Sequence, residues 1–482
     1  AFILSTVNHH AAEALKMLAS IHRAQRCLYL KHLGGRVGRQ TPWRRFSWQV
    51  ACLQENAEFP CVDACPCFNA HQVQDWPKES QVPEELINGY SSLQPNPLRM
   101  EEVLAMKDFQ ATAKMLKLEI PVRLANRIAH LSHLDMMENC QALLCARARL
   151  VRSFKEVLGA ADTSLEDFAE VVRTVKERHK HQVKRLTVGM KDLKRLRVEA
   201  GANEAEVIEE IDKFLDGFVL SRIGIEMLNS QYLSMFSQNT GIADPHCDPC
   251  AIARRAGRFA RKIASKEFEG SVPEVDVTFH GKADARTLPL VPSYLMYILL
   301  ELLKNSVRAV AEQHRASGST NVVPPIVIRV ASDDSQMVMD IFDRGGGIPF
   351  ELQQRVWSYM YSTRRGSPGT LQSDAAEATP LAGFGVGLPL SRLYAEYIGG
   401  SLQLVSMPNF GTHAFLFLER CSSRKEGMPT YVNWLRKRHL LEELLDLEGR
   451  KRAAVEVEDY AEALRLKGLC AEVHQKLKEF HS

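Results

Sequence analysis

The chain has 482 residues, of which 45% are apolar and 25% charged, a composition typical of a folded globular protein that excludes wholesale disorder. Its 61 basic and 58 acidic residues give a formal net charge of +3, which provides no general attraction to nucleic acid. No run reaches the roughly 18 uninterrupted apolar residues of a membrane-spanning helix. The best candidate, 288–303, contains two prolines and Glu301, so we expect no membrane span.

Basic residues are concentrated near the N-terminus. Between residues 1 and 54, eight Lys and Arg side chains are accompanied by a single acid, Glu13. An Arg-rich, acid-poor start is typical of an organelle transit peptide, and an ordinary basic arm is the alternative. We favour mitochondrial targeting and interpret residues 1–88 as a transit peptide followed by a loosely ordered leader.

Eleven cysteines are too few for a disulfide framework in a chain of this length. Cys61, Cys65 and Cys67 lie near His71 and could ligate zinc, but no second CxxC-type pair lies at a suitable distance. We therefore favour free thiols over a zinc site.

The region after the leader has a helical pattern. Apolar residues recur at three- and four-residue spacing in 100–118, 124–137, 165–186 and 208–235. Four long amphipathic segments predict a four-helix bundle, which we assign to residues 89–240.

Strands and helices alternate beyond residue 241. Strands are expected as one hairpin over 326–330 and 337–342 and a second over 402–405 and 413–418, with helices over 292–313 and 388–397. This mixture predicts an α+β fold, with helices on one face of a sheet, for residues 241–422. A helical tail is expected over 423–482.

Three polar side chains share one face of the helix expected over 292–313. Glu301, Asn305 and Arg308 are spaced i, i+4 and i+7. These groups are costly to bury without a purpose on an otherwise apolar helix, although a solvated stripe would also explain this block taken alone. The chain has no GxxxxGK[ST] loop and no HRDxxxxN or DFG set, so nucleotide chemistry would need another design.

Two glycine-rich blocks follow. Asp343 ends an apolar strand before Gly345, Gly346 and Gly347, so a ligand could approach the backbone while the carboxylate accepts from a ligand N–H group. Residues 383–387 (GFGVG) open the helix at 388–397, where free backbone amides form an anion site suited to phosphates. Each block alone is also compatible with an ordinary turn.

Taken together and in this order, the three blocks resemble the N, G1 and G2 boxes of the ATPase superfamily that includes histidine kinases, type II topoisomerases, Hsp90 and MutL. The resemblance implies that Asn305 is the Mg²⁺ ligand, that Asp343 reads the adenine amino group, and that Thr412 supports the base. It implies ATP and Mg²⁺ as cofactors and allows a monovalent cation near the lid over the phosphates. The nucleotide-binding residues it implies are Glu301, Lys304, Asn305, Arg308, Asp343, Gly345, Gly347, Ser362, Thr363, Gly383, Phe384, Gly385, Val386, Gly387, Leu388 and Thr412.

Longer segments resemble the mitochondrial protein kinases, the family of the pyruvate dehydrogenase kinases and the branched-chain 2-oxoacid dehydrogenase kinase. They are 118–126, 221–228, 359–363 and 380–394, within a match that runs from about 90 to 420. The resemblance implies an ATP-dependent protein serine kinase of the mitochondrial matrix that inactivates the E1 component of a 2-oxoacid dehydrogenase. It also implies a homodimer that docks the lipoyl domain of the E2 core.

The resemblance assigns roles to two ionisable side chains. Glu301 would be the general base that accepts the substrate hydroxyl proton, and His179 would orient it. A two-component phosphoacceptor His would need a following acid and a nearby proline, which the block 177–183 lacks. A structural bundle histidine is the remaining alternative for His179.

The substrate stays open at this point. Residues 380–394 and 221–228 look closer to the pyruvate dehydrogenase kinases, whereas 395–404 and the lack of an Asp-Trp pair in the tail look closer to the branched-chain enzyme. We favour pyruvate dehydrogenase, and keep the branched-chain enzyme and a non-catalytic nucleotide- or lipoyl-binding relative as alternatives. Residues 364–379 have no apolar period, and we expect them to be a lid that is mobile without nucleotide and orders over the phosphates.

Overall fold

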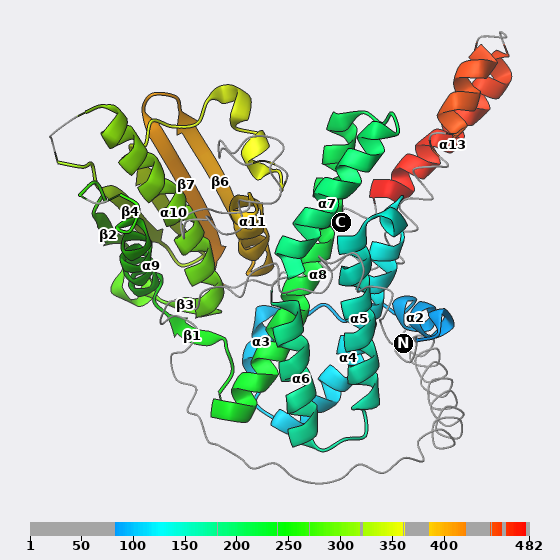
Figure 1. The fold of residues 1–482 in the computed structure, drawn as a ribbon, viewed down its shortest axis with the longest axis horizontal. Coiled ribbons are helices and arrows are strands. Elements are labelled where there is room, and N and C mark those ends of the chain that lie inside the picture. Colours follow the sequence, from blue (N-terminus) through cyan, green and yellow to red (C-terminus); the bar gives the residue numbers. More distant parts are fainter. Residues whose placement is uncertain are drawn as a thin grey trace. The chain divides into compact units, whose positions relative to one another are not determined.

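The structure is a computed structural model of the chain (Figure 1). It describes residues 82–180, 182–238, 240–268, 270–318, 322–359, 361, 385–420, 444, 446–455 and 459–478. Most of the expected leader, the considered zinc ligands, the lid at 364–379, and Ser362, Thr363, Gly383 and Phe384 therefore lie outside the described residues.

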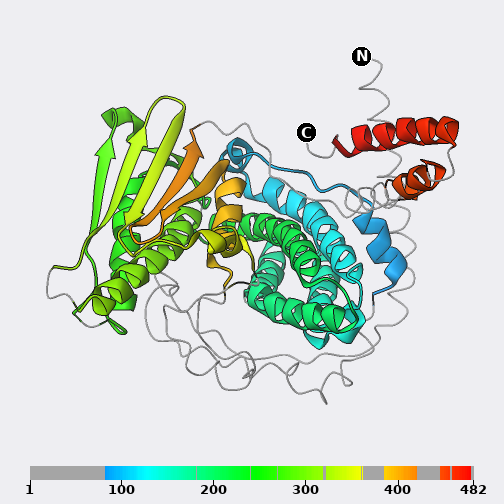
Figure 2. The same ribbon diagram turned by 90° about the horizontal axis from the view of Figure 1, so that it is seen from above.

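The first described part of the chain is helical, and Figure 2 shows its long helices nearly end-on around a common core. Helix α4 packs against α5 and α8, α7 packs against the same two helices, and α6 packs against α8. The elements are α2 (Glu84–Ser91), α3 (Met100–Ala105), α4 (Phe109–Ser132), η5 (Met137–Asn139), α5 (Gln141–Gly159), α6 (Leu165–His179), α7 (Gln182–Glu199) and α8 (Glu204–Gln238).

Helix α4 differs from the sequence-based expectation. The segments 100–118 and 124–137 were expected as separate helices, but α4 runs unbroken through Pro121. A proline inside a helix costs about 3 kcal/mol because it removes a backbone hydrogen bond and crowds the preceding turn. Ile120 and Leu124 are both fully buried, and each such side chain contributes roughly 1.5–3 kcal/mol, which offsets that cost.

The second part of the chain contains a five-stranded sheet in the order β2-β4-β5-β7-β6. Strands β2 and β4 are parallel and the other pairs are antiparallel. Both hairpins expected from the sequence are present, and the α+β prediction is confirmed. The strands are β2 (Val275–His280), β4 (Ile326–Ser332), β5 (Gln336–Asp343), β6 (Gly400–Met407) and β7 (Gly411–Glu419), and β1 (Asp244–Cys247) pairs separately with β3 (Leu288–Leu290).

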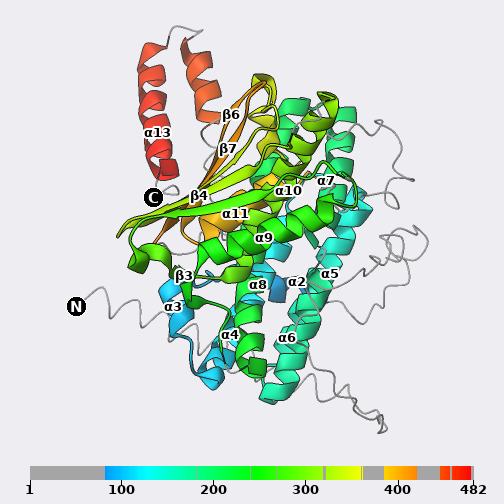
Figure 3. The ribbon, with the colours of Figure 1, turned by 90° about the vertical axis from the view of Figure 1, so that its left-hand side faces the viewer.

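Helices cover one face of this sheet (Figure 3). Helix α9 (Pro249–Ala264) packs on β2, α10 (Pro292–Ala316) on β5 and α11 (Gly387–Tyr397) on β6. Alternate residues of β4, such as Ile326, Ile328 and Val330, are fully buried beneath the helices. Short turns η6 (Ala283–Arg286), η7 (Phe350–Leu352) and η8 (Arg355–Trp357) complete this part of the fold.

The described part of the tail contains helical residues 446–455 and α13 (Tyr460–Lys478). Leu447 and Ala454 pack with Leu466, Cys470 and Val473 in a small core of their own. The domain boundaries at 88, 240 and 422 remain predictions. Within the described ranges, none of the helices combines the length and apolarity that crossing a membrane requires.

Candidate active site

Helix α10 carries the first group of predicted site residues, which are Glu301, Asn305 and Arg308. Leu302 and Val307 are buried, while the intervening Asn305 is exposed. The Glu301 carboxylate pairs with Lys304 at 2.6 Å between Oε1 and Nζ, and their side chains are only 16% and 15% exposed. A mostly buried ion pair of this kind holds the carboxylate in one place, since neither partner can leave without stranding the other.

Arg308 of the same block is differently engaged. Its Nε donates to Glu312 Oε1 at 2.7 Å, one turn further along α10. The sequence pattern had placed Arg308 on the face of Glu301 and Asn305, but the guanidinium is paired within its own helix here.

Asp343 ends β5 and is only 5% exposed. Ser306 Oγ donates to its Oδ2 at 2.7 Å, and the Gly345 amide donates to its Oδ1 at 3.0 Å. Burial raises the pKa of the Asp343 carboxyl, and the hydrogen bonds from Ser306, Gly345 and the Thr412 amide partly offset the rise. The carboxylate is therefore fixed in position, with lone pairs left to accept from a ligand.

Two serines of this region were missed from the sequence. Ser306 follows Asn305 directly and is buried, so a polar side chain between apolar positions of α10 was the available signal. Ser406 Oγ lies 2.9 Å from Thr412 Oγ1 and accepts from the Ile348 amide at 2.7 Å. It holds the loop after Asp343 against the β6–β7 hairpin.

The glycines after Asp343 are required by the chain's own packing. Gly346 and Gly347 have φ of 83° and 70°, a region that side-chain-bearing residues rarely adopt. A Cβ at Gly347 would collide with the Met407 carbonyl, and one at Gly345 would collide with Ala309 of α10. The loop therefore lies close against both α10 and the hairpin.

The start of α11 meets Glu301. Gly387 is the first residue of α11, and a Cβ there would lie 2.6 Å from Glu301 Oε2. Gly385 has a φ of 79° and Val386 is the residue that precedes the helix. The backbone amides that begin α11, which attract anions, are thus adjacent to the Glu301 carboxylate.

Among the described residues the structure brings the predicted site residues into two groups. Glu301, Lys304 and Gly387 lie together at the start of α11, and Asp343, Gly345 and Thr412 lie together at the end of β5. Val386 and Leu388 flank Gly387.

Asn305 fits a role in metal binding. Its side chain is exposed beside Glu301, and within the described ranges no side-chain hydrogen bond engages it. In the same ranges no three His, Cys, Asp or Glu side chains are grouped to hold a metal. Mg²⁺ commonly takes one or two protein oxygens and completes its shell with phosphates and water, so a single carboxamide suits it.

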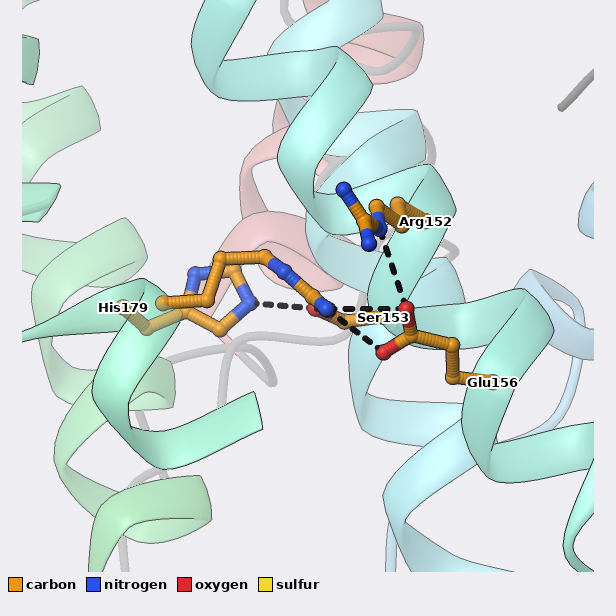
Figure 4. A network of polar contacts seen from close by, with 5 residues as sticks. Arg152, Ser153, Glu156 and His179 are labelled. Carbon is orange, nitrogen blue, oxygen red and sulfur yellow. Dashed lines mark hydrogen bonds and ion pairs between the residues drawn. The ribbon is translucent and has the colours of Figure 1, made fainter. Parts of the chain in front are cut away.

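His179 lies in the bundle, at the end of α6 (Figure 4). Its Nε2 lies 2.8 Å from Ser153 Oγ, which also accepts from Arg178 Nη1 at 2.7 Å. Arg178 in turn pairs with Glu156. No hydrogen bond between described residues joins His179 to Glu301, so the orienting role of His179 remains a prediction.

Burial, together with the positive charges of Arg127, Arg178 and Arg222, lowers the pKa of His179 to about 3. The imidazole is therefore neutral at physiological pH. It can form a hydrogen bond with Ser153 but carries no charge.

A depressed histidine pKa makes stability depend on pH. In the unfolded chain His179 binds a proton near pH 6.5, whereas in the folded chain it stays neutral. The stability of the fold therefore falls as the pH drops below 6.5. At pH 5 we expect His179 to lower the free energy of unfolding by about 2 kcal/mol relative to pH 7. The His179→Gln variant should lose this slope when unfolding by urea is measured at both pH values. Parallel pH profiles for the variant and the wild type would show that the pKa of His179 is ordinary.

Comparisons with known proteins match both parts of the chain. A family model described as mitochondrial branched-chain alpha-ketoacid dehydrogenase kinase matches residues 97–256. A second, described as histidine kinase-, DNA gyrase B-, and HSP90-like ATPase, matches residues 291–421 and so contains both groups of site residues.

Individual relatives match over about two thirds to three quarters of the chain. The mitochondrial [pyruvate dehydrogenase (acetyl-transferring)] kinase of Arabidopsis thaliana is 36% identical over 335 residues, which cover 66% of this chain and 87% of the relative. Isozyme 1 of Rattus norvegicus is 31% identical, covering 73% and 84%, and the Drosophila melanogaster kinase is 32% identical, covering 72% and 87%. This chain therefore belongs to the family of mitochondrial protein kinases that contains the pyruvate dehydrogenase kinases and the branched-chain 2-oxoacid dehydrogenase kinase.

Proposed function

We propose that this protein kinase acts in the mitochondrial matrix on a serine of the E1 component of pyruvate dehydrogenase. The observation that carries the proposal is the contact between Glu301 and the start of α11, because it puts a carboxylate beside amides suited to phosphate. The relatives named pyruvate dehydrogenase kinases support the substrate.

Glu301 is the general base in this proposal. Its Oε1 is paired with Lys304, which leaves Oε2 to accept the proton of the substrate hydroxyl. As the proton leaves, the serine oxygen bonds to the γ-phosphorus of ATP and the bond to the ADP oxygen breaks. Amides at the start of α11 lie where charge on the transferred group can be stabilised. Mg²⁺ bound at Asn305 would supply further neutralisation of the phosphates.

Asp343 is the adenine reader in this proposal. Its buried carboxylate is held by Ser306 and Gly345, and accepts the amino N–H of the base. Thr412, bonded to Ser406, supports the same end of the site. A monovalent cation near the lid, the lipoyl domain as docking partner and the lid over 364–379 remain predictions.

Branched-chain dehydrogenase E1 is the second candidate substrate, because the family model that matches residues 97–256 is that of the branched-chain enzyme. Incubation with γ-labelled ATP, Mg²⁺ and each purified E1, side by side, decides between them. We expect faster labelling of pyruvate dehydrogenase E1. Faster labelling of the branched-chain E1 would reverse the assignment, and labelling of neither, with ATP still bound, would leave a non-catalytic relative.

Substitutions on α10 separate binding from transfer. Asn305→Ala should abolish Mg·ATP binding, since Asn305 holds a ligand already present in the ground state. Glu301→Gln should leave binding largely intact and lower the transfer rate by 100-fold or more, about the contribution of a general base. Calorimetry with a non-hydrolysable analogue and phosphate labelling measure the two effects.

The control for these variants is Glu274→Gln, which removes a carboxylate that is also ion-paired, in this case with Arg261, away from the site. Its binding and transfer should match the wild type. An Asn305→Ala variant with wild-type nucleotide affinity would contradict the metal assignment.

We also propose that the kinase is a homodimer, and the face of the sheet that none of the described helices covers supports it. Phe342, His413 and Phe415 form a continuous ring stack across β5 and β7, with centroid distances of 4.3 and 5.6 Å. Val405 and Met407 of β6 are 57% and 63% exposed beside them. An exposed surface rich in aromatic and apolar side chains commonly marks an interface.

Val405→Lys should convert the dimer to a monomer, because it puts a charge on the exposed apolar face without disturbing the core. Sedimentation equilibrium measures the change. Ala251→Lys, at an exposed position of α9 on the helix side of the sheet, is the matched control and should stay dimeric. An unchanged dimer in Val405→Lys would exclude this face as the interface.

A further inference from the structure

Three segments that are distant in the sequence meet at Asp216. Tyr359 Oη donates to Asp216 Oδ1 at 2.8 Å, and Arg392 Nη2 lies 3.2 and 3.0 Å from Oδ1 and Oδ2. Asp216 belongs to α8 of the bundle and Arg392 to α11, while Tyr359 follows η8. One bundle carboxylate thus binds residues on either side of 362–384, a stretch outside the described residues.

The surroundings reinforce this junction. Tyr359 is only 1% exposed, and its backbone N–H donates to Asp212 Oδ1 at 3.1 Å, one turn earlier on α8. Burial, with the nearby Asp216 charge, raises the pKa of the Tyr359 phenol well above its usual value, so the phenol remains a donor. The Trp357 ring lies under the Arg392 guanidinium at 5.5 Å. Tyr359 and Arg392 therefore each have a second contact in addition to Asp216.

Helix α11 connects the junction to the base. Arg392 lies five residues after Gly387, about 8 Å along the helix axis at 1.5 Å per residue. Gly387 contacts Glu301 at the other end of this stretch. Since a short helix moves as a rigid body, the place where α11 meets Glu301 depends on how Arg392 is held on α8.

We propose that Asp216 is a positioning residue for phosphoryl transfer: it fixes α11 and the Tyr359 segment on α8, so that the first amides of α11 stand beside Glu301. This inference rests on the proposed kinase function and deepens it, since it makes a bundle helix part of the phosphate end of the site. Asp216 acts through Arg392 and contacts no substrate.

The main effect of the ion pair between Asp216 and Arg392 is not to stabilise the fold. The side chain of Asp216 is 36% exposed, and ion pairs at such positions add little to folding free energy. Helix α11 has other anchors, since Leu393 is buried and Tyr394 packs on Tyr297 with a centroid distance of 4.8 Å. Loss of Asp216 should therefore leave the fold intact and displace the start of α11.

The test compares Asp216→Asn, Arg392→Gln and the double variant with the wild type. In each single variant we expect the affinity for a non-hydrolysable ATP analogue and kcat on E1 to fall about tenfold, the factor for one hydrogen bond to a charged group. Binding of adenosine, which lacks phosphates, should be unchanged. The double variant should lose no more than either single variant, because both remove the same interaction.

Glu209→Gln is the matched control, because it removes another paired carboxylate of α8, bonded to Lys213, on an exposed surface. It should behave as the wild type in every measurement. Equal losses of adenosine and analogue affinity in Asp216→Asn, or no loss of either, would overturn the inference. If the wild type labels neither E1, the kinase proposal fails by itself, and the two affinities still decide the role of Asp216.

Discussion

The hydrogen bond from Ser306 to Asp343 is the contact on which the rest of the site depends. It joins the end of a central strand to the middle of α10, across 37 residues of sequence. Because Asp343 is almost fully buried, its carboxylate needs this donor and the Gly345 amide to remain in place. With that strand end fixed on α10, Asp343 and the Glu301–Lys304 pair belong to one rigid element.

The bundle and the sheet domain contribute differently to the chemistry. The sheet domain carries the groups that would touch the nucleotide, whereas α8 of the bundle supplies Asp212 and Asp216, which bind Tyr359 and Arg392. His179 and its partner Ser153 stay within the bundle. Helices α8 and α11 pack against each other where the bundle meets the sheet domain.

Much of this arrangement was predictable from local sequence. Period-2 patterns predicted both hairpins, and the spacing of Glu301 and Asn305 placed these two residues on one face of α10. The bundle helices were predicted only in part, since α5 was missed and the segment 165–186 is divided between α6 and α7. Long-range contacts were not predictable: Ser153 with His179 spans 26 residues and Arg392 with Asp216 spans 176. The continuity of α4 through Pro121 was not predictable for the same reason, because only tertiary burial of neighbouring residues compensates for the proline.

The glycine loop after Asp343 also affects the energetics of binding. Gly347 is pressed against Met407, and Gly411 against the Asp343 carbonyl, so closely that neither position can hold a side chain. The end of the site that would meet the base is thus assembled by the protein's own packing. A ligand arriving there has little chain entropy to remove. Adenine should therefore bind to a preformed site, and conformational change on nucleotide binding should occur where the protein meets the phosphates.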